Sequence, residues 1–175
     1  MNKLVITFAG VPGSSKSPII NHLSPTFDLP VFSNDQLRFE IREDLHIDAI
    51  TIPKALKLYK TKVKQIRNDI LSSGKSVILD GSVDRKWPEL KAELVENGYT
   101  WFLISNDYSV EFMTNLYVST GRLWAVEELD AYDKQHKAFL AKYSSDVNLH
   151  LADEDFIDRV RICKEAISKF MGTQD

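Results

Sequence analysis

The segment Gly10-Val11-Pro12-Gly13-Ser14-Ser15-Lys16-Ser17 constrains this chain more than any other part of its sequence. It follows an apolar run at residues 4–9, which is typical of a buried strand, and it precedes a helical pattern. The segment is close to the pattern G-x-x-x-x-G-K-[ST], in which a glycine-rich turn points backbone N–H groups at a polyphosphate and the next helix adds its positive end. We therefore predict a strand, a phosphate-binding loop and a helix in this order. An ordinary strand-turn-helix corner is the alternative interpretation.

The loop pattern assigns a mechanical role to each kind of residue. Lys16 is expected to reach the outer phosphates of ATP, and the hydroxyl of Ser17 to ligate Mg²⁺. One position departs from the pattern, because Ser15 stands where the second glycine is expected and its Cβ restricts the backbone. Gly13 is the residue we expect to supply that freedom instead. The predicted ATP-binding residues are Gly10, Pro12, Gly13, Ser14, Ser15, Lys16 and Ser17.

The composition limits the class of protein. A chain of 175 residues with 43% hydrophobic and 27% charged residues is typical of a single folded domain, which we place at residues 1–175. A net charge of −3 argues against a protein that coats nucleic acid, although it permits a local basic cleft. The lone Cys163 excludes an internal disulfide, and we expect it to be buried. No run has the length or pattern of a membrane span or a signal peptide, so we expect a cytoplasmic protein, and no obligate protein partner is evident.

Short apolar segments alternate with helical patterns along the chain, which favours a parallel α/β sheet. The expected strands are residues 3–9, 30–33, 76–80, 100–105 and 147–151. The expected helices are residues 15–23, 35–44, 53–73, 86–97, 110–119, 125–142 and 153–171. No repeat or linker divides the chain.

A carboxylate ends the strand expected at residues 76–80. Three apolar residues precede Asp80, in an arrangement similar to a Walker B motif. Ligands of open α/β sheets bind at the carboxyl edge of the strands, so Asp80 is a candidate to support Mg²⁺ directly or through water. The alternative is an aspartate that begins a turn with Gly81.

Asp35 and Arg38 lie one helical turn apart after the second expected strand. Transfer of a phosphoryl group to a hydroxyl needs a group that orients and accepts the hydroxyl proton, and a cation that holds the acceptor. Both side chains can face one cleft at this spacing. The alternative is that Asp35 caps the helix and Arg38 is on the surface.

These motifs, in this order, resemble those of P-loop kinases of the polynucleotide 5′-hydroxyl kinase type and of their small “predicted kinase” relatives. The segments that carry the resemblance are residues 10–17, 34–38 and 77–80. The resemblance implies a three-layer α/β/α P-loop NTPase fold with a five-stranded parallel sheet of order 2-3-1-4-5. It also implies that Asp35 is the general base and that Arg38 binds the acceptor phosphate.

Members of that family carry a mobile helical lid with arginines, which we place at about residues 113–130. Arg122 is the candidate to neutralise charge on the transferring phosphate. The family often shows two basic residues here, whereas this chain has one, and a surface arginine is the alternative for Arg122.

The chain also contains a row of basic residues and four histidines. Lys57, Lys60, Lys64 and Arg67 share one face of the helix expected at residues 53–73, which could guide a nucleic-acid end or simply be solvent-exposed. The four histidines, His22, His46, His136 and His150, have no metal-ligand spacing, so we expect structural or surface roles for them.

The sequence therefore predicts an ATP-dependent kinase that uses Mg²⁺ and phosphorylates a hydroxyl group. The acceptor is a nucleic-acid 5′-hydroxyl, a nucleotide or another small molecule. Two alternatives stay open: a nucleotide-binding regulatory module with little turnover, and a toxin-like kinase that acts on a cell-wall precursor.

Overall fold

Burial of β1 (Leu4–Gly10) on both of its faces organises the molecule. Side chains alternate along a strand, so Leu4, Ile6 and Phe8 enter one apolar cluster while Val5 and Ala9 enter another on the opposite side. A strand with two buried faces belongs in the middle of a parallel sheet that is covered by helices on both sides.

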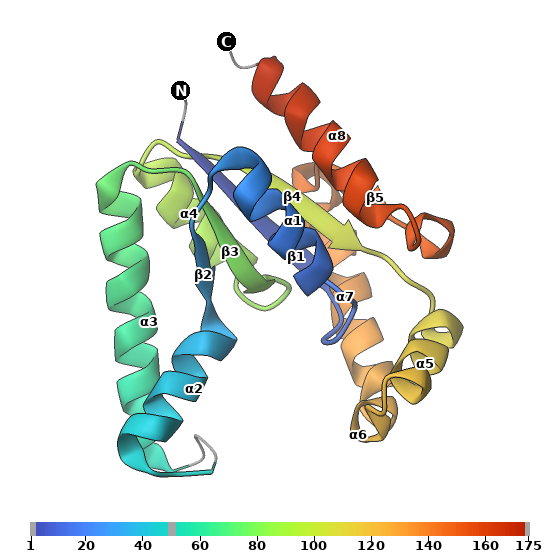
Figure 1. Cartoon of the computed structure of the whole chain (residues 1–175), viewed down its shortest axis with the longest axis horizontal. Helices are drawn as coiled ribbons and strands as arrows, with labels where there is room; N and C mark the ends of the chain where they lie inside the picture. Colours follow the sequence, from blue (N-terminus) through green and yellow to red (C-terminus); the bar gives the residue numbers. More distant parts are fainter. Residues whose placement is uncertain (1–2, 49–51, 174–175) are drawn as a thin grey trace.

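The computed structural model, which describes residues 3–48 and 52–173, contains this sheet. Its strands are β2 (Val31–Ser33), β3 (Val77–Ser82), β1, β4 (Thr100–Asn106) and β5 (Leu149–Leu151), in the order β2-β3-β1-β4-β5. All neighbouring strands are parallel (Figure 1). The predicted fold class and strand order are confirmed.

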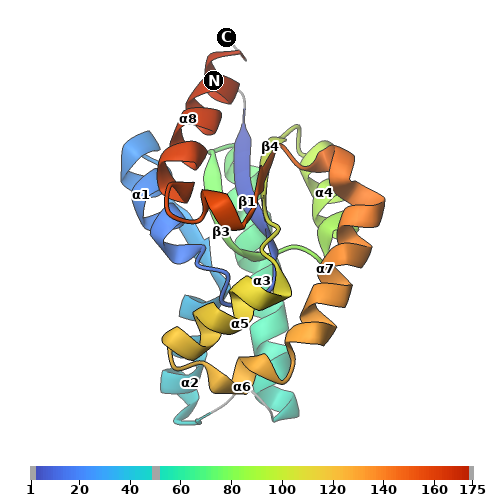
Figure 2. The same cartoon turned by 90° about the vertical axis from the view of Figure 1, so that its right-hand side faces the viewer.

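Helices cover the two faces of the sheet and complete the three layers (Figure 2). The cluster that contains Leu4 receives side chains from α1 (Ser17–Phe27) and α8 (Arg159–Gly172). The opposite cluster receives side chains from α3 (Pro53–Ser73), α4 (Trp87–Glu96) and α7 (Leu129–Tyr143). Cys163 is buried as expected, and burial raises the pKa of its thiol to about 12.

Three helices lie beyond the carboxyl ends of the strands, where a ligand of this fold would bind. They are α2 (Asn34–Leu45), α5 (Val110–Ser119) and α6 (Leu123–Val126). Figure 1 shows α2 on one side of the loop that follows β1, and α5 and α6 on the other side. In the part of the chain that the structure describes, no helix has both the length and the hydropathy to cross a membrane.

Three predicted helices differ from the structure by more than one residue at an end. The helix expected at residues 15–23 continues through Pro25, because the buried Leu23 and the half-buried Phe27 keep its last turn packed on the core. The helix expected at residues 125–142 is divided into α6 and α7, which run in different directions (Figure 2).

The last helix begins at Arg159 rather than at residue 153. Its expected acidic first turn forms a separate 3₁₀ turn at Asp153–Asp155. There Asp153 accepts hydrogen bonds from the backbone and hydroxyl of Ser109, and Asp155 accepts one from the backbone of Ala152. The local polar bonds therefore override the helical pattern of the sequence.

Asp146 satisfies a buried indole on the α4 side of the sheet. Trp87 is fully buried, and its Nε1 donates to Oδ2 of Asp146 at 2.8 Å. Lys91 donates to the other carboxylate oxygen at 2.6 Å, and Trp101 donates to the backbone oxygen of Asp146.

We expect Asp146→Ala to lower the free energy of unfolding by about 2 kcal/mol, because it leaves the indole N–H of Trp87 buried without an acceptor. Urea unfolding followed by tryptophan fluorescence measures this change. Asp44→Ala is the matched control, since Asp44 makes an exposed ion pair with Lys62 and the loss of this pair should cost less than about 0.5 kcal/mol. Equal losses in the two variants would contradict the role given to Asp146.

Candidate active site

The loop between β1 and α1 turns sharply, because three of its residues have left-handed backbone conformations. Gly10, Gly13 and Ser15 all have positive φ angles, of 121°, 72° and 62°. A Cβ atom at Gly10 would lie 2.9 Å from the backbone oxygen of Asn106, so this position needs glycine. The expectation that Gly13 would replace the freedom missing at Ser15 is wrong, because Ser15 itself adopts the left-handed conformation.

Two side chains, one from α5 and one from the turn before α6, bond to the first half of the loop. The hydroxyl of Tyr117 on α5 donates to the backbone oxygen of Pro12, and Nη1 of Arg122 donates to the backbone oxygen of Gly13 at 3.2 Å. A Cβ atom at Gly13 would lie 3.0 Å from both of these side chains. The predicted lid residue Arg122 therefore lies on the loop, and glycine at position 13 lets it approach.

Ser14 is held from β4. It is fully buried, and Nδ2 of Asn106 donates to its backbone oxygen at 2.9 Å and to its hydroxyl at 3.1 Å. Asn106 also makes the close contact that requires Gly10, so the end of β4 fixes both sides of the loop.

Lys16 lies inside the loop. Its ammonium donates to the backbone oxygen of Val11 at 3.0 Å and to the hydroxyl of Ser14 at 2.8 Å. Desolvation lowers the pKa of Lys16 to about 8, although nearby carboxylates act in the opposite direction. An incoming anion would strengthen the charged form of this lysine.

The carboxylates that act on Lys16 belong to Asp84, Asp80 and Asp35. They come from the segment after β3, from β3 itself and from α2. The predicted residues Asp35 and Asp80 therefore lie at the same edge of the sheet as the loop lysine, together with Asp84, which was not among the predicted site residues.

The two predicted carboxylates have different surroundings. Asp80 is half-buried and its Oδ2 accepts a hydrogen bond from the hydroxyl of Ser33 at 3.1 Å. Asp35 is exposed and pairs with Arg38 at 3.2 Å. Ser33, and not Asp35, caps α2, because its hydroxyl accepts from the backbone of Gln36.

The oxygen donors near the loop suit a magnesium ion. Ser17 is the exposed first residue of α1, and Asp80 offers a carboxylate at the edge of the sheet. Mg²⁺ prefers such hard oxygen ligands and usually completes its shell with water and substrate phosphates. Within residues 3–48 and 52–173, no group of three or more histidine, cysteine or acidic side chains is arranged to hold a metal by itself.

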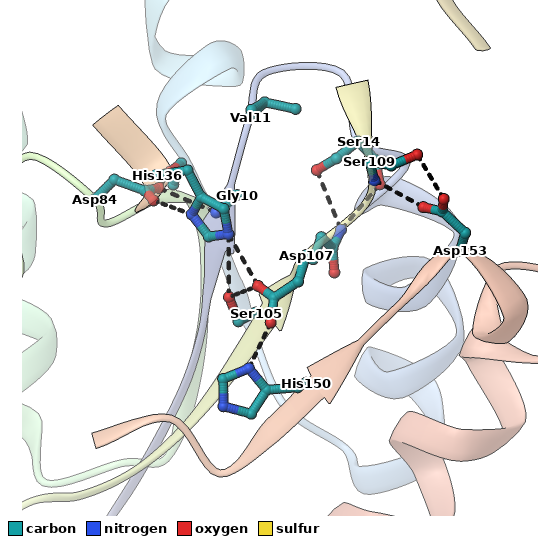
Figure 3. A network of polar contacts seen from close by, with 12 residues as sticks. Gly10, Val11, Ser14, Asp84, Ser105, Asp107, Ser109, His136, His150 and Asp153 are labelled. Atoms are coloured by element: carbon teal, nitrogen blue, oxygen red, sulfur yellow. Dashed lines mark hydrogen bonds and ion pairs between the residues drawn. The ribbon is translucent and has the colours of Figure 1, made fainter. Parts of the chain in front are cut away.

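A buried ionic network, which the sequence did not reveal, supports the start of the loop (Figure 3). The backbone N–H of Gly10 donates to Oδ2 of Asp84 at 3.0 Å. Oδ1 of Asp84 lies 2.5 Å from Nδ1 of His136, and Nε2 of His136 lies 2.9 Å from Oδ1 of Asp107. The second oxygen of Asp107 contacts Nδ1 of His150. His136 was expected only to have a structural or surface role, and through Asp84 it connects α7 to the loop that begins at Gly10.

Both nitrogens of His136 face carboxylates, and this sets its charge. Burial alone would lower its pKa, but the hydrogen bonds to Asp107 and Asp84 raise the pKa of His136 to about 9. Burial likewise opposes ionisation of the two aspartates, yet their bonds to His136 keep the pKa of each below its ordinary value. His136 is therefore an imidazolium at neutral pH that donates to both partners.

A pocket of about 520 Å³, open to solvent, lies next to Asp80. Its apolar lining is formed by Phe32, Val63, Leu79, Val83 and Leu90. Its polar lining includes Asn34, Arg67, Asp80 and Lys86. Oδ1 of Asn34 is buried and has no hydrogen-bond partner among the residues that the structure describes.

Arg67 does not lie on an open basic surface. Its guanidinium pairs with Glu93 on α4, with an Nε–Oε2 distance of 2.7 Å and an Nη2–Oε1 distance of 2.8 Å. Of the face predicted on α3, Lys57, Lys60 and Lys64 remain exposed, while the charge of Arg67 is already compensated. This weakens the interpretation of α3 as a track for nucleic acid.

Comparison with known proteins shows the fold. No family model and no curated protein sequence matched the chain. A gluconokinase structure from Sinorhizobium meliloti 1021 superposes with a TM-score of 0.64 at 14% identity, covering 99% of this chain and 95% of that one. A shikimate kinase from Aquifex aeolicus gives 0.57 at 14% identity, with coverage of 94% and 98%.

A structure from the PezAT chromosomal toxin–antitoxin system of Streptococcus pneumoniae gives a TM-score of 0.62 at 15% identity, covering 87% of this chain and 69% of that one. The chain therefore has the fold of P-loop kinases. The polynucleotide kinase type suggested by the motifs stays a prediction.

We expect the stabilisation by His136 to disappear at high pH. Its pKa is about 9 in the folded protein and 6.5 in the reference state, so this stabilisation is complete below pH 6.5 and is lost as the pH rises through 9. The gap in unfolding free energy between the native protein and His136→Gln should shrink by on the order of 3 kcal/mol between pH 6.5 and 10.

Urea unfolding at a series of pH values measures this gap. The exposed His22 provides the matched control, because His22→Gln should follow the native protein at every pH. A gap for His136→Gln that stays constant from pH 6.5 to 10 would show that the imidazolium is not the stabilising form.

Proposed function

We propose that this chain is an ATP-dependent phosphotransferase that phosphorylates a hydroxyl group of a small molecule. The observation that supports the proposal is the position of Lys16, which is held within the loop after β1, at the same carboxyl edge of the sheet as Asp80, which lines the pocket. A glycine-containing loop on one side and a carboxylate-lined pocket on the other suit a donor phosphate and an acceptor hydroxyl.

The loop residues 10–17 would hold the ATP phosphates. Their backbone N–H groups and the first turn of α1 supply positive potential, and Lys16 would exchange its bonds to Val11 and Ser14 for bonds to phosphate oxygens. Ser17 and Asp80 would hold Mg²⁺, which when bound neutralises charge on the phosphates.

The chemical step needs little more than position and charge. The acceptor oxygen forms a bond to the γ-phosphorus, the bond from that phosphorus to the bridging oxygen breaks, and ADP leaves. Asp35 would orient the hydroxyl and accept its proton, with Arg38 holding the carboxylate and reaching the acceptor. Arg122, which lies against Gly13, would stabilise the charge of the transferring group.

The pocket favours a small acceptor. Its apolar wall suits a compact carbon framework. Asn34 offers a buried acceptor oxygen for a second hydroxyl. Lys86 makes no ion pair with any residue that the structure describes, so an acceptor with a negative charge would fit best.

A toxin-like kinase acting on a cell-wall precursor is the second candidate. It is favoured by the similarity to the PezAT structure, and it needs the same donor site. The fold is shared with kinases that act on different acceptors. Activity measured against a panel of acceptors therefore distinguishes the two candidates.

We expect Asp35→Asn to lower kcat by about 10²–10⁴-fold, because the variant keeps the size of the side chain but cannot accept the hydroxyl proton. Asp44→Asn on the same helix is the matched control and should leave kcat unchanged.

Lys16→Ala should reduce the rate by at least about 100-fold. Retention of full activity in Lys16→Ala would contradict the donor site.

The assay follows ATP consumption with Mg²⁺ across sugars, hydroxy acids, nucleosides, amino-sugar nucleotides and 5′-hydroxyl oligonucleotides. Transfer to a small alcohol supports the proposal, and transfer to an amino-sugar nucleotide selects the second candidate. Transfer only to oligonucleotides would overturn the small acceptor. Binding of ATP without transfer to any acceptor would replace the enzyme with a nucleotide-binding module.

A further inference from the structure

Ser15 has a backbone conformation that costs energy in this chain. Its φ of 62° lies in the left-handed region, which residues with a Cβ atom avoid and glycine adopts freely. Lys16, the next residue, has a right-handed φ of −72°. Alternation of the two hands turns successive backbone N–H groups to the same side, which is the geometry that binds a phosphate. The loop therefore needs Ser15 in this conformation.

One side chain from the far end of the chain contacts Ser15. Nη2 of Arg159, the first residue of α8, donates to Oγ of Ser15 at 2.9 Å. The two residues are 144 positions apart. The bond joins the side chain of the strained residue to a separate element of the fold.

Arg159 is itself held firmly before it reaches the loop. Its guanidinium carbon lies 4.0 Å from the ring centroid of Phe156, and Nη1 donates to the backbone oxygen of Phe156. The ring of Phe156 packs in turn on Phe112 and Tyr108, at centroid distances of 4.9 and 5.5 Å. The fork of Arg159 is therefore oriented by an aromatic cluster, and little freedom is lost when it binds Ser15.

The charge of Arg159 also points toward the loop. Arg159 forms no ion pair with an acidic residue in the described part of the chain, whereas Arg161 on the same helix pairs with Asp158 and Glu165. An arginine with no neutralising partner beside a phosphate-binding loop adds to its positive potential.

We infer that Arg159 is a positioning residue that keeps Ser15 in the left-handed conformation, so that the pair Ser15–Arg159 performs the role that glycine performs alone in the usual loop pattern. The consequence for phosphate binding rests on the proposed function. The physical coupling between the two residues does not, since it is present in the protein without nucleotide.

The test is a double-mutant cycle of the full chain with Arg159→Met, Ser15→Gly and the double variant. Methionine keeps an apolar stem on Phe156 but cannot bond to Ser15. The first readout is the melting temperature without nucleotide. We expect the double variant to lose less than the sum of the two single losses, because Arg159 has no hydroxyl to hold once Ser15 is replaced.

The second readout is the dissociation constant for Mg²⁺–ATP, measured by isothermal titration calorimetry. Arg159→Met should weaken binding about tenfold when Ser15 is present, which corresponds to the cost of one left-handed residue. In the Ser15→Gly background the same substitution should weaken binding by less than about threefold. Arg161→Met is the matched control on α8. It should leave the dissociation constant for Mg²⁺–ATP unchanged both with Ser15 present and in the Ser15→Gly background.

Equal weakening of binding by Arg159→Met in both backgrounds would overturn the inference, since it would show that Arg159 acts on the nucleotide directly. The inference would also be overturned if the loss of melting temperature in the double variant equalled the sum of the losses in the two single variants. If the native protein binds no ATP, the proposed function fails, and the melting temperatures still decide the coupling. If Arg159→Met does not fold, Arg159→Lys replaces it in both readouts. Lysine keeps the positive charge but lacks the planar guanidinium group.

Discussion

The hydrogen bond from the backbone of Gly10 to Asp84 is the contact on which the geometry of the site depends. Gly10 ends the central strand, and Asp84 follows the strand beside it. A buried carboxylate is costly unless it is paired, and His136 on α7 supplies the compensating charge while it also binds Asp107 after β4. One imidazolium therefore joins the ends of three strands to a helix, and the loop starts from a fixed point.

The rest of the loop is rigid for a related reason. Its backbone N–H groups must face inward, so its carbonyl groups and side chains must find partners outside it. Asn106 holds Ser14, Tyr117 and Arg122 hold the carbonyl groups of Pro12 and Gly13, and Arg159 holds Ser15. These partners come from β4, α5, the turn before α6 and α8. The helices beside the loop thus shape it as well as covering it.

Sequence periodicity predicted the strands, because apolar runs alternate with helical patterns, but it did not predict these supports. The strand order was implied by the resemblance to P-loop kinases, and the glycine-containing loop followed from a local motif. Asp84 and His136 are 52 residues apart and form no spacing that a motif could contain. The same holds for Ser15 and Arg159, although the serine in a glycine position was a visible sign that another residue had to compensate. Contacts between distant elements depend on how helices are placed on the sheet, which local patterns do not specify.

The two halves of the candidate site are attached to the core in different ways. The loop between β1 and α1 is bonded to strands and helices, whereas α2 and α3 contact the core through polar pairs that include Ser33 with Asp80 and Arg67 with Glu93. Contacts between α2 and α3 include the guanidinium of Arg38 over the ring of Tyr59. Residues of α2, α3 and α4 line the pocket, so substitutions there can change the pocket without disturbing the loop. Because a fold alone does not define a function, the lining of this pocket, and not the loop, is the part of the proposed site in which specificity for an acceptor would lie.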